Sequence, residues 1–315
     1  MSSAFGVGEN RPLRIAIAGV GKIARDQHVP ALMADPGFAL VAAMTLEGEI
    51  DGLPVHRSIG ALLNGGHALD AIVICTPPAD RSAIAGAAIN AGIAVMLEKP
   101  PAATLSEIAL ISADAAARGV TLFAAWHSRE AAGVDAAREW LAQRVIDQVS
   151  VFWREDIRRW HPGQDWILAA GGFGVFDPGI NALSIVTRIL PQPLIVEHAE
   201  IYVPNARQAP IRASAVMRSG QIPVSIDLDF LHQGEQQWDI EVSAGGDTLK
   251  LRQGGRIIEV DGQVTEGANQ EYPRLYRKFH ALVTNGQSDV DVAPLRLVTD
   301  MLRVAVCRDA PEFEW

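Results

Sequence analysis

A glycine-rich turn near the start of the chain has the spacing of a phosphate-binding loop. Gly19 and Gly21 are followed by Ala24, directly after the apolar run 14–19 and at the opening of a helical pattern. The first glycine permits a tight turn, the second lets backbone N–H groups approach a pyrophosphate, and the small third residue lets the helix pack closely. The helix N-terminus also stabilises negative charge. In this context we interpret the turn as a dinucleotide site rather than as a tight turn without a ligand.

The end of the second predicted strand bears on which dinucleotide would bind. An acidic side chain at this point hydrogen-bonds the ribose hydroxyls, whereas an arginine accommodates a 2′-phosphate. The chain carries Glu47 and Glu49 here, and no arginine follows the strand until Arg57. The sequence therefore favours NAD and leaves NADP open. Either glutamate could equally be a loop charge in water.

A lysine stands where a strand of the predicted sheet ends. Lys99 follows Glu98 and the apolar run 94–97, and it precedes Pro100 and Pro101. Ligands of open α/β folds bind at the carboxyl edge of the sheet. An exposed lysine that only forms a surface ion pair would rarely be held between an apolar strand and two prolines. We therefore expect Lys99 to have a function.

A second polar group follows a glycine-rich stretch in the other half of the chain. Asp177 and Asn181 are four residues apart, so they share one face if both are helical. Pro178 suits the first turn of a helix. Asp177 could then serve only as the N-cap of that helix, and this alternative stays open.

Three tryptophans, Trp153, Trp160 and Trp166, lie within fourteen residues of one another. They could be ordinary core residues. A carbohydrate site is the sharper interpretation, because an indole face stacks on the C–H face of a pyranose while nearby carboxylates and amides bind its hydroxyls. The polar residues grouped with them are His127, Glu155 and His161.

The elements that must position these residues fall into two classes. The first half alternates apolar strands with helices, which is typical of right-handed βαβ crossovers and a parallel sheet. The second half contains strands that alternate apolar and polar residues, which indicates a large, open, mainly antiparallel sheet with one solvated or partner-facing side. The expected strands are 14–19, 38–45, 71–76, 94–99, 121–126, 149–157 and several within 194–260. A helical pattern follows the glycine turn and continues to about residue 33, and the other expected helices are 79–90, 105–118, 131–143, 176–190, 272–285 and 294–307.

The fold class predicted is therefore α/β followed by α+β. A doubly wound parallel sheet of the Rossmann type is expected over residues 1–130. A substrate-binding and oligomerisation domain is expected over 131–315, with C-terminal helices that could pack back on the first domain. A chain of 315 residues suits two domains, and 49% apolar residues with 20% charged residues exclude wholesale disorder.

The charge and the cysteine content of the chain exclude several classes of partner and location. Twenty-seven basic against 37 acidic residues give a net charge of −10 with no basic run, so no nucleic-acid partner is expected. Cys75 and Cys307 are too far apart in sequence for a metal-ligand cluster and form no disulfide framework, which favours a reducing compartment and no metal. The N-terminal stretch lacks the apolar region of a secretory signal. The longest apolar stretch, 82–97, is interrupted and too short to span a membrane. We expect a cytoplasmic protein.

Several blocks resemble the Gfo/Idh/MocA oxidoreductase family, the relatives of glucose–fructose oxidoreductase and inositol dehydrogenase. These blocks are GVGKIARDQH at 19–28, the turn at 98–100 and FDPGIN at 176–181. More specifically, the blocks at 121–128, 154–166, 174–191, 271–276 and 288–296 resemble the D-galactose and L-arabinose 1-dehydrogenase branch of that family. The resemblance runs from about Leu13 to about Arg303.

The resemblance implies NAD(P)-dependent oxidation of the anomeric carbon of a neutral aldopyranose to the aldonolactone, with D-galactose, L-arabinose and D-fucose as candidate substrates. It implies a homo-oligomer formed by pairing of open sheets. The implied catalytic residues are Lys99, Asp177 and Asn181. The implied sugar contacts are His127, Glu155, Trp160 and Trp238. The implied cofactor contacts are Gly19, Gly21, Lys22, Ile23, Thr45, Thr76, Pro77, Glu98 and Lys99.

One position departs from the wider family. Members similar to inositol dehydrogenase carry histidine as the proton acceptor where this chain has Asn181, which cannot act as a base. An anomeric hydroxyl is more acidic than an ordinary alcohol, so Asp177 or Lys99 could take its proton. Asn181 argues against the alternative of oxidation at a ring carbon of another sugar or an inositol. Retention of Lys99 argues against a non-catalytic dinucleotide-binding sensor or co-repressor.

Overall fold

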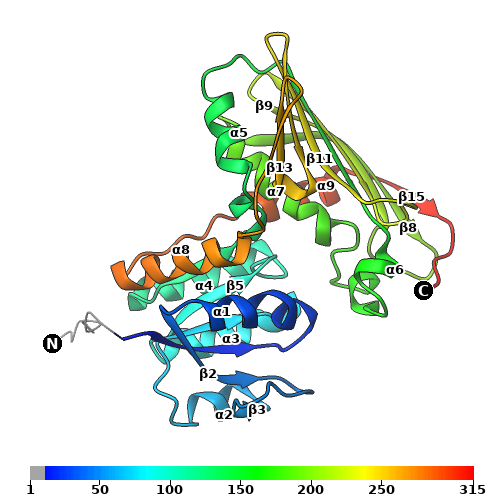
Figure 1. Ribbon diagram of the computed structural model, residues 1–315. Coiled ribbons are helices and arrows are strands. Elements are labelled where there is room, and N and C mark those ends of the chain that lie inside the picture. The colour runs from blue at the N-terminus through cyan, green and yellow to red at the C-terminus, as the bar shows by residue number, and fades with distance from the viewer. Residues whose placement is uncertain (1–10) are drawn as a thin grey trace. The chain divides into compact units, whose positions relative to one another are not determined.

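The computed structural model describes residues 11–315 and divides them into two compact units (Figure 1). Unit 1 comprises the chain up to Ala125 together with Tyr272–Val292, and unit 2 comprises Trp126–Glu271 with Ala293–Trp315. These units differ from the ranges 1–130 and 131–315, because the first division falls after Ala125 and a later segment returns to unit 1. Residues 1–10 lie outside the described part of the chain. The expectation that the N-terminal stretch is no secretory signal concerns these residues.

Unit 1 is built on a six-stranded sheet in the order β3-β2-β1-β4-β5-β6, with every neighbouring pair parallel. The strand order reverses beside β1, so the predicted doubly wound parallel sheet is confirmed. Its strands are β1 (Leu13–Ala18), β2 (Phe38–Met44), β3 (Val55–His56), β4 (Ala71–Ile74), β5 (Ala94–Glu98) and β6 (Leu122–Ala125). Its helical elements are η1 (Ala24–His28), α1 (Val29–Ala34), α2 (Ile59–Leu63), α3 (Pro78–Asn90), α4 (Leu105–Arg118) and nearly all of α8 (Glu271–Asn285).

Local sequence signals explain these elements. All four residues of β4 and all five of β5 are buried, as expected for strands covered on both faces. Helix α4 begins with a capping box in which Thr104 and Glu107 satisfy each other's backbone N–H groups, and it ends at Gly119 in the left-handed conformation. The helical pattern after the glycine turn differs from the expectation, because it forms one π-helical segment, η1, before α1.

Unit 2 is built on a nine-stranded sheet in the order β14-β13-β12-β11-β7-β10-β9-β8-β15. Only the β7–β10 and β8–β15 pairs are parallel, so the predicted large, mainly antiparallel sheet is confirmed. Its strands are β7 (Gln148–Arg154), β8 (Leu194–Pro204), β9 (Arg212–Ser219), β10 (Ile222–Asp229), β11 (Gln237–Ala244), β12 (Asp247–Arg252), β13 (Ile257–Val260), β14 (Gln263–Glu266) and β15 (Val306–Ala310). Its helical elements are η2 (His127–Glu130), α5 (Val134–Leu141), α6 (Ile157–Trp160), η3 (Asp165–Leu168), α7 (Phe176–Ile189), η4 (Gln253–Gly255) and α9 (Ala293–Val304).

Two predicted boundaries in unit 2 are wrong. The strand expected to reach residue 157 ends at Arg154, because Asp156 caps the short helix α6 through the N–H of Arg158. The helix expected to reach residue 307 ends at Val304, and Cys307 lies in β15, which pairs with the edge of the sheet at β8.

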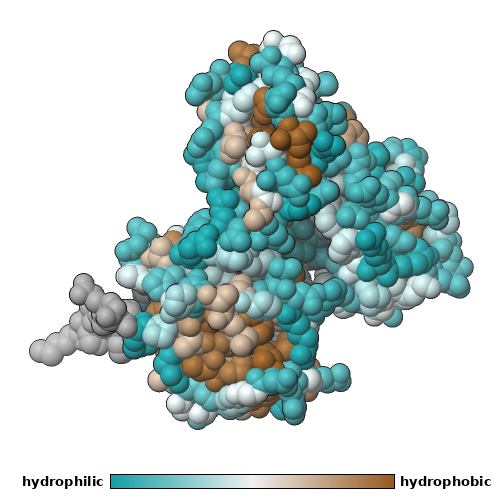
Figure 2. Space-filling model, in the orientation of Figure 1, coloured by the Kyte–Doolittle hydropathy of each residue, from teal (hydrophilic) through white to brown (hydrophobic). Residues whose placement is uncertain are grey.

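Burial alternates along the strands of unit 2. In β9, and in β10 up to Leu228, every second residue is buried, including Met217 and Ile226, while the residues between them are exposed or half-buried. One sheet face therefore carries the core of the unit. On the side shown in Figure 2, polar and hydrophobic residues are mixed over unit 2, whereas hydrophobic side chains gather in one area of unit 1. Within residues 11–315, no helix has the length and apolar character that crossing a bilayer requires.

Candidate functional site

The glycine turn of unit 1 is packed between strand ends. Gly19 donates its N–H to the Met44 carbonyl at 2.7 Å, at the end of β2. Gly19 has φ +89°, and a Cβ there would lie 2.6 Å from the backbone nitrogen of Thr76. Both facts require glycine. A Cβ on Gly21 would meet nothing within 4 Å, so the backbone of this residue borders open space.

Thr76 supplies an independent sign of a ligand beside this turn. Its Oγ1 is buried and has no hydrogen-bond partner among residues 11–315. A buried hydroxyl left unpaired costs on the order of 1–3 kcal/mol, so a bound group that completes it is favoured. Pro77 follows as the N-cap of α3, which places a helix N-terminus next to Thr76. The turn, the space at Gly21 and this hydroxyl fit the pyrophosphate of a dinucleotide.

Lys22 and Ile23, two further predicted cofactor contacts, lie on the exposed side of the turn. Lys22 forms an ion pair with Asp26 one helical turn later, and Ile23 is 36% exposed. Both side chains are thus accessible from the turn.

Positively charged side chains lie beside the loop after β2, although one of them, Arg57, is distant from that loop in the sequence. Because β3 runs parallel beside β2, it brings Arg57 back to the end of β2. Arg57 donates to the carbonyl groups of Thr45, Leu46 and Gly48 at 3.1–3.2 Å. A Cβ on Gly48 would also lie 2.8 Å from the guanidinium of Arg25. Two arginines therefore flank the loop in which the ribose of a dinucleotide lies in Rossmann folds.

The turn that carries Lys99 is fixed by two buried side chains. Arg81 is 4% exposed and donates to the carbonyl groups of Thr76, Glu98 and Pro100. The Glu98 carboxylate accepts the Lys99 backbone N–H at 2.5 Å. The backbone on both sides of Lys99 is therefore held, and Arg81 is a residue that the sequence did not single out.

Glu98 is itself part of a buried network within unit 1. Its Oε1 accepts the Tyr272 hydroxyl at 2.8 Å and lies 3.2 Å from Nε2 of His28, whose Nδ1 lies 2.7 Å from the Tyr276 hydroxyl. Burial is the largest cause that raises the pKa of Tyr276 well above its ordinary value. Glu98 thus supports the Lys99 turn, and its contact with a cofactor stays a prediction.

In unit 2, Asp177 and Asn181 both lie in α7, so their four-residue spacing puts them on one face. The helix begins at Phe176 with Val175 at the N-cap position, so the alternative that Asp177 is only the N-cap is wrong. Asp177 is 5% exposed in the first helical turn. This buried carboxylate is stabilised by the helix dipole.

His161 lies between two buried carboxylates. Its Nε2 is 3.5 Å from Glu155 Oε1 and 3.9 Å from Asp177 Oδ2. Trp238 Nε1 donates to the other Glu155 oxygen at 2.8 Å. Burying carboxylates is costly unless polar groups pair with them, and the imidazole of His161 supplies such a group near both. The sequence grouped His161 with this region without giving it a role, because the segments meet only in the fold.

The aromatic part of this cluster is formed by Trp160 and Trp238, whose ring centroids are 5.0 Å apart. The buried Nε1 of Trp160 has no hydrogen-bond partner within residues 11–315, which is a second donor that a ligand could satisfy. Trp153 is 3% exposed and stacks behind Trp238, so it is a core residue. Trp166 is 37% exposed.

His127 is oriented by a carboxylate that the sequence did not single out. Its Nδ1 lies 2.6 Å from Oε2 of Glu271. An ionised carboxylate can only accept in this contact, so Nδ1 carries a proton and Glu271 orients the imidazole. Arg129 ties the same 3₁₀ segment to α7 through the Ser184 carbonyl and the Thr187 hydroxyl, both at 2.9 Å.

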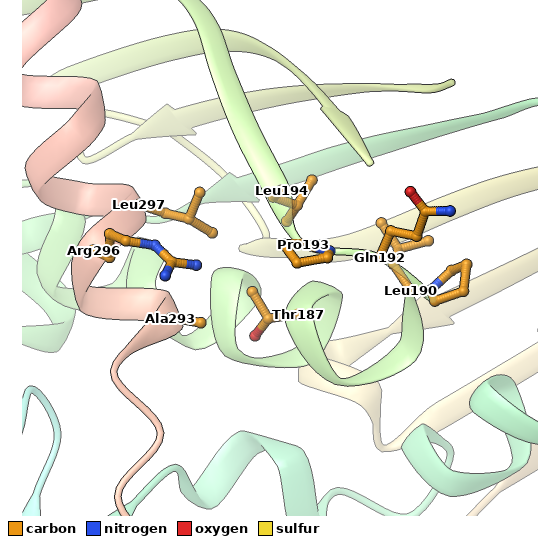
Figure 3. A pocket seen from close by; sticks show the side chains of 9 residues that line it. Thr187, Leu190, Gln192, Pro193, Leu194, Ala293, Arg296 and Leu297 are labelled. Atoms are coloured by element: carbon orange, nitrogen blue, oxygen red, sulfur yellow. The ribbon is translucent and has the colours of Figure 1, made fainter. Parts of the chain in front are cut away.

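A separate cavity of about 260 Å³ lies in unit 2 (Figure 3). It is bordered by the end of α7, the loop that follows and the start of α9, with Arg296 and Gln192 supplying polar side chains. The predicted catalytic and sugar-contact residues are not among those that line it. The cavity is therefore distinct from the cluster around His161.

The doubly wound sheet, the glycine turn and the polar cluster of the second unit define an NAD-binding oxidoreductase. The chain belongs to the Gfo/Idh/MocA oxidoreductase family, so the predicted family and enzyme class are confirmed. Residues 13–126 match the family model described as oxidoreductase family, NAD-binding Rossmann fold. The predicted use of NAD or NADP is confirmed at this level, whereas the preference between them stays a prediction.

Individual relatives agree over nearly the whole chain. The sequence is 45% identical over 293 residues to a galactose 1-dehydrogenase from Pseudomonas fluorescens, covering 92% of this chain and 95% of the relative. A crystal structure of a D-galactose-1-dehydrogenase protein from Rhizobium etli has 45% identity and a TM-score of 0.94, covering 98% and 99% of the two chains. KijD10, a 3-ketoreductase from Actinomadura kijaniata solved with NADP and TDP-benzene, is only 18% identical and shares the fold, with a TM-score of 0.84 over 95% and 100% of the chains.

Proposed function

We propose that this protein is an aldose 1-dehydrogenase that oxidises the anomeric carbon of D-galactopyranose or a related aldopyranose to the aldonolactone with NAD or NADP. The observation that carries the proposal is the cluster in unit 2, where Trp160 packs against Trp238, Trp238 donates to Glu155, and His161 lies near the carboxylates of Glu155 and Asp177. Apolar faces with a few buried polar groups are the surroundings that a pyranose requires. The 45% identity to a galactose 1-dehydrogenase supports this class of substrate.

Substrate binding is assigned to the aromatic and polar residues of unit 2. The faces of Trp160 and Trp238 stack on the sugar ring, and the Trp160 Nε1 donates to a ring substituent. Glu155 and His127 bind hydroxyl groups, and Glu271 orients the imidazole of His127 for this contact. These contacts fix the orientation of C1 for reaction.

The chemistry is assigned to Asp177, Asn181 and Lys99. Asp177 accepts the proton of the anomeric hydroxyl, Asn181 orients that hydroxyl, and the ammonium of Lys99 stabilises the developing oxyanion electrostatically. The nicotinamide, when bound, supplies the acceptor for the C1 hydride. As the C1–H bond breaks and the proton reaches Asp177, the C1–O1 bond becomes the lactone carbonyl. Lys99 is the alternative proton acceptor.

The choice of sugar depends on the group at C5 of the ring. L-Arabinopyranose is D-galactopyranose without the C6 hydroxymethyl group, and D-fucose carries a methyl there. One methylene in an apolar pocket is worth about 10- to 200-fold, so loss of such a group from a partly apolar pocket should discriminate only modestly. We therefore expect all three sugars to be oxidised.

The proposal extends to location and assembly. Cys75 and Cys307 are both free thiols, which agrees with a reducing compartment such as the cytoplasm. The exposed face of the nine-stranded sheet is proposed to pair with a second copy of the chain.

An absorbance assay at the NADH band tests the proposal. D-Galactose, L-arabinose, D-fucose, D-glucose and myo-inositol are each offered with NAD and with NADP. The expected result is turnover of the first three sugars with a lactone as product. Turnover of myo-inositol alone would replace the proposal with oxidation at a ring carbon, and no turnover of any sugar would contradict it.

A further inference from the structure

The segment 156–168, which we call the sugar-contact segment, carries Trp160 and His161. It consists of α6, a turn with Gly163 at φ +68°, and η3. Between the buried Ile157 and Ile167, every side chain is exposed or half-buried. Core packing therefore fixes its two ends, and other contacts must hold the part that carries the indole and the imidazole.

Residues 313–315 contact this segment at two points. Trp315 Nε1 donates to Asp165 Oδ1 at 2.6 Å. Arg158 donates to the carbonyl group of Glu314 at 2.6 Å, and its guanidinium lies 4.6 Å from the ring centroid of Phe313. The two points of contact lie on either side of Trp160 and His161 in the sequence.

Phe313 is the centre of these contacts. Its ring is 4% exposed, packs edge-on against Trp315 at 5.3 Å, and has the guanidinium of Arg207 5.9 Å from its centroid. Arg207 also donates to Asp165 at 3.0 Å. The hydrogen bond from Trp315 and the one from Arg207 lower the pKa of Asp165, so its carboxylate stays charged and keeps both donors at neutral pH.

We propose that Phe313 and Trp315 are positioning residues that brace the sugar-contact segment and hold Trp160 and His161 in the conformation that binds sugar. The inference rests on the proposed function, since it assigns the segment to sugar binding. A segment ordered before the ligand arrives spares the ligand the cost of ordering it. Stacking on Trp160 exists in both the ground state and the transition state, so loss of the brace raises the sugar KM more than it lowers kcat.

The test compares Phe313→Ala and Trp315→Ala with the wild type. We expect the sugar KM to rise about five-fold or more, with kcat within about two-fold and the NAD KM unchanged. Trp315→Phe keeps the ring and loses only the donor, so its KM should lie between those of the wild type and Trp315→Ala. Hydrogen exchange in peptides from 157–168 should be faster in both alanine variants without any sugar present.

The control is Trp140→Ala, which removes a half-buried indole of α5 that has the guanidinium of Arg144 4.0 Å from its ring centroid. It should leave the sugar KM and exchange in 157–168 unchanged. If Phe313→Ala does not fold, Arg207→Gln tests the same contacts from a surface side chain. An unchanged sugar KM and unchanged hydrogen exchange of the segment in the folded variants would overturn the proposed positioning role of Phe313 and Trp315. Absence of sugar oxidation by the wild type would instead overturn the proposed function, while the exchange experiment would still report on the contacts.

Discussion

At Thr76, the contribution of a side chain to protein stability can be measured separately from its contribution to cofactor binding. Its buried Oγ1 is unpaired within residues 11–315. Thr76→Val keeps the shape of the side chain and removes the unpaired hydroxyl, so we expect the cofactor-free protein to gain about 1 kcal/mol of stability. The KM for the dinucleotide should rise about ten-fold, the loss expected for one hydrogen bond to a charged group. Urea unfolding and steady-state kinetics measure the two effects. A loss of stability, or an unchanged cofactor KM, would show that the hydroxyl does not serve a ligand.

Substitution of either Asp177 or Lys99 should lower kcat. Asp177→Asn preserves size and removes the proton acceptor, so we expect kcat to fall by about 10²- to 10⁴-fold. Lys99→Ala should also lose most of kcat because the oxyanion loses its cation. NAD binding, measured by calorimetry, should be retained in both variants. Near-wild-type turnover in both would contradict the assignment, and near-wild-type turnover in Asp177→Asn alone would exclude Asp177 as the essential proton acceptor.

The candidate site could be predicted from the sequence only where spacing along one element carries the information. The glycine turn, Lys99 at a strand end, and Asp177 with Asn181 on one helix are of this kind. The contact of His161 with Asp177 and the contact of Arg57 with the β2 loop join segments that pack together only in the fold. No local periodicity encodes such contacts.

Helix α7 owes its position to a glycine in the FDPGIN motif. A Cβ on Gly179 would lie 2.6 Å from a terminal methyl of the buried Leu228 on β10. Overpacking costs about 1–3 kcal/mol, which exceeds the 0.5–1 kcal/mol that alanine gains over glycine within a helix. We therefore expect Gly179→Ala to destabilise unit 2 by about 1–2 kcal/mol and to lower kcat, because Asp177 moves with the helix.

Gly86 provides the matched comparison for that substitution. It lies within α3, and a Cβ there would meet nothing within 4 Å. Gly86→Ala should stabilise the protein by about 0.5–1 kcal/mol, as measured by urea unfolding. In a Leu228→Ala background, the cost of Gly179→Ala should largely disappear. An equal cost in both backgrounds would show that the contact with Leu228 is not its cause.

The pairing of β3 with β2 has a consequence for cofactor choice. Arg57 reaches the carbonyl groups of the loop after β2, where a 2′-phosphate would add a charged partner. We expect Arg57→Ala to lower kcat/KM for NADP about ten-fold and to change the value for NAD by less than about two-fold. Parallel kinetics with the two cofactors measure the ratio. An equal loss with both would mean that Arg57 only supports the loop.

Helices and strands could be predicted where one hydrophobic pattern extends over many residues. The buried parallel strands and α4, with its capping box, follow from apolar runs and end signals. The two-residue β3 and the edge strand β15 do not, because each exists through its pairing with a neighbour rather than through its own apolar pattern. In β15 all residues except Ala310 are exposed.

At the scale of the whole molecule, the net charge of −10 would oppose association of two copies unless the contact face were neutral. The exposed face of the nine-stranded sheet carries basic and acidic side chains in cross-strand pairs. The N···O distances are 2.5 Å for Arg154–Asp227, 3.0 Å for Arg218–Glu197, 2.9 Å for Lys250–Glu241, 2.6 Å for Arg252–Glu259 and 2.8 Å for Arg308–Glu200. Such pairs contribute little stability to one chain, but they leave this face locally balanced in charge.

Val216 tests whether that face pairs with a second copy. It is 46% exposed at the middle of β9 and lies opposite Ser225 of β10. Val216→Glu places an unpaired charge on the face, and burying it in an interface would cost several kcal/mol, so we expect the oligomer to dissociate. Light scattering should then give about the monomer mass of 33.8 kDa with unchanged circular dichroism. Val145→Glu, at an 81% exposed position outside the sheet, should leave the mass of the oligomer unchanged. A wild type that is already monomeric, or an oligomer that survives Val216→Glu, would remove this face as the interface.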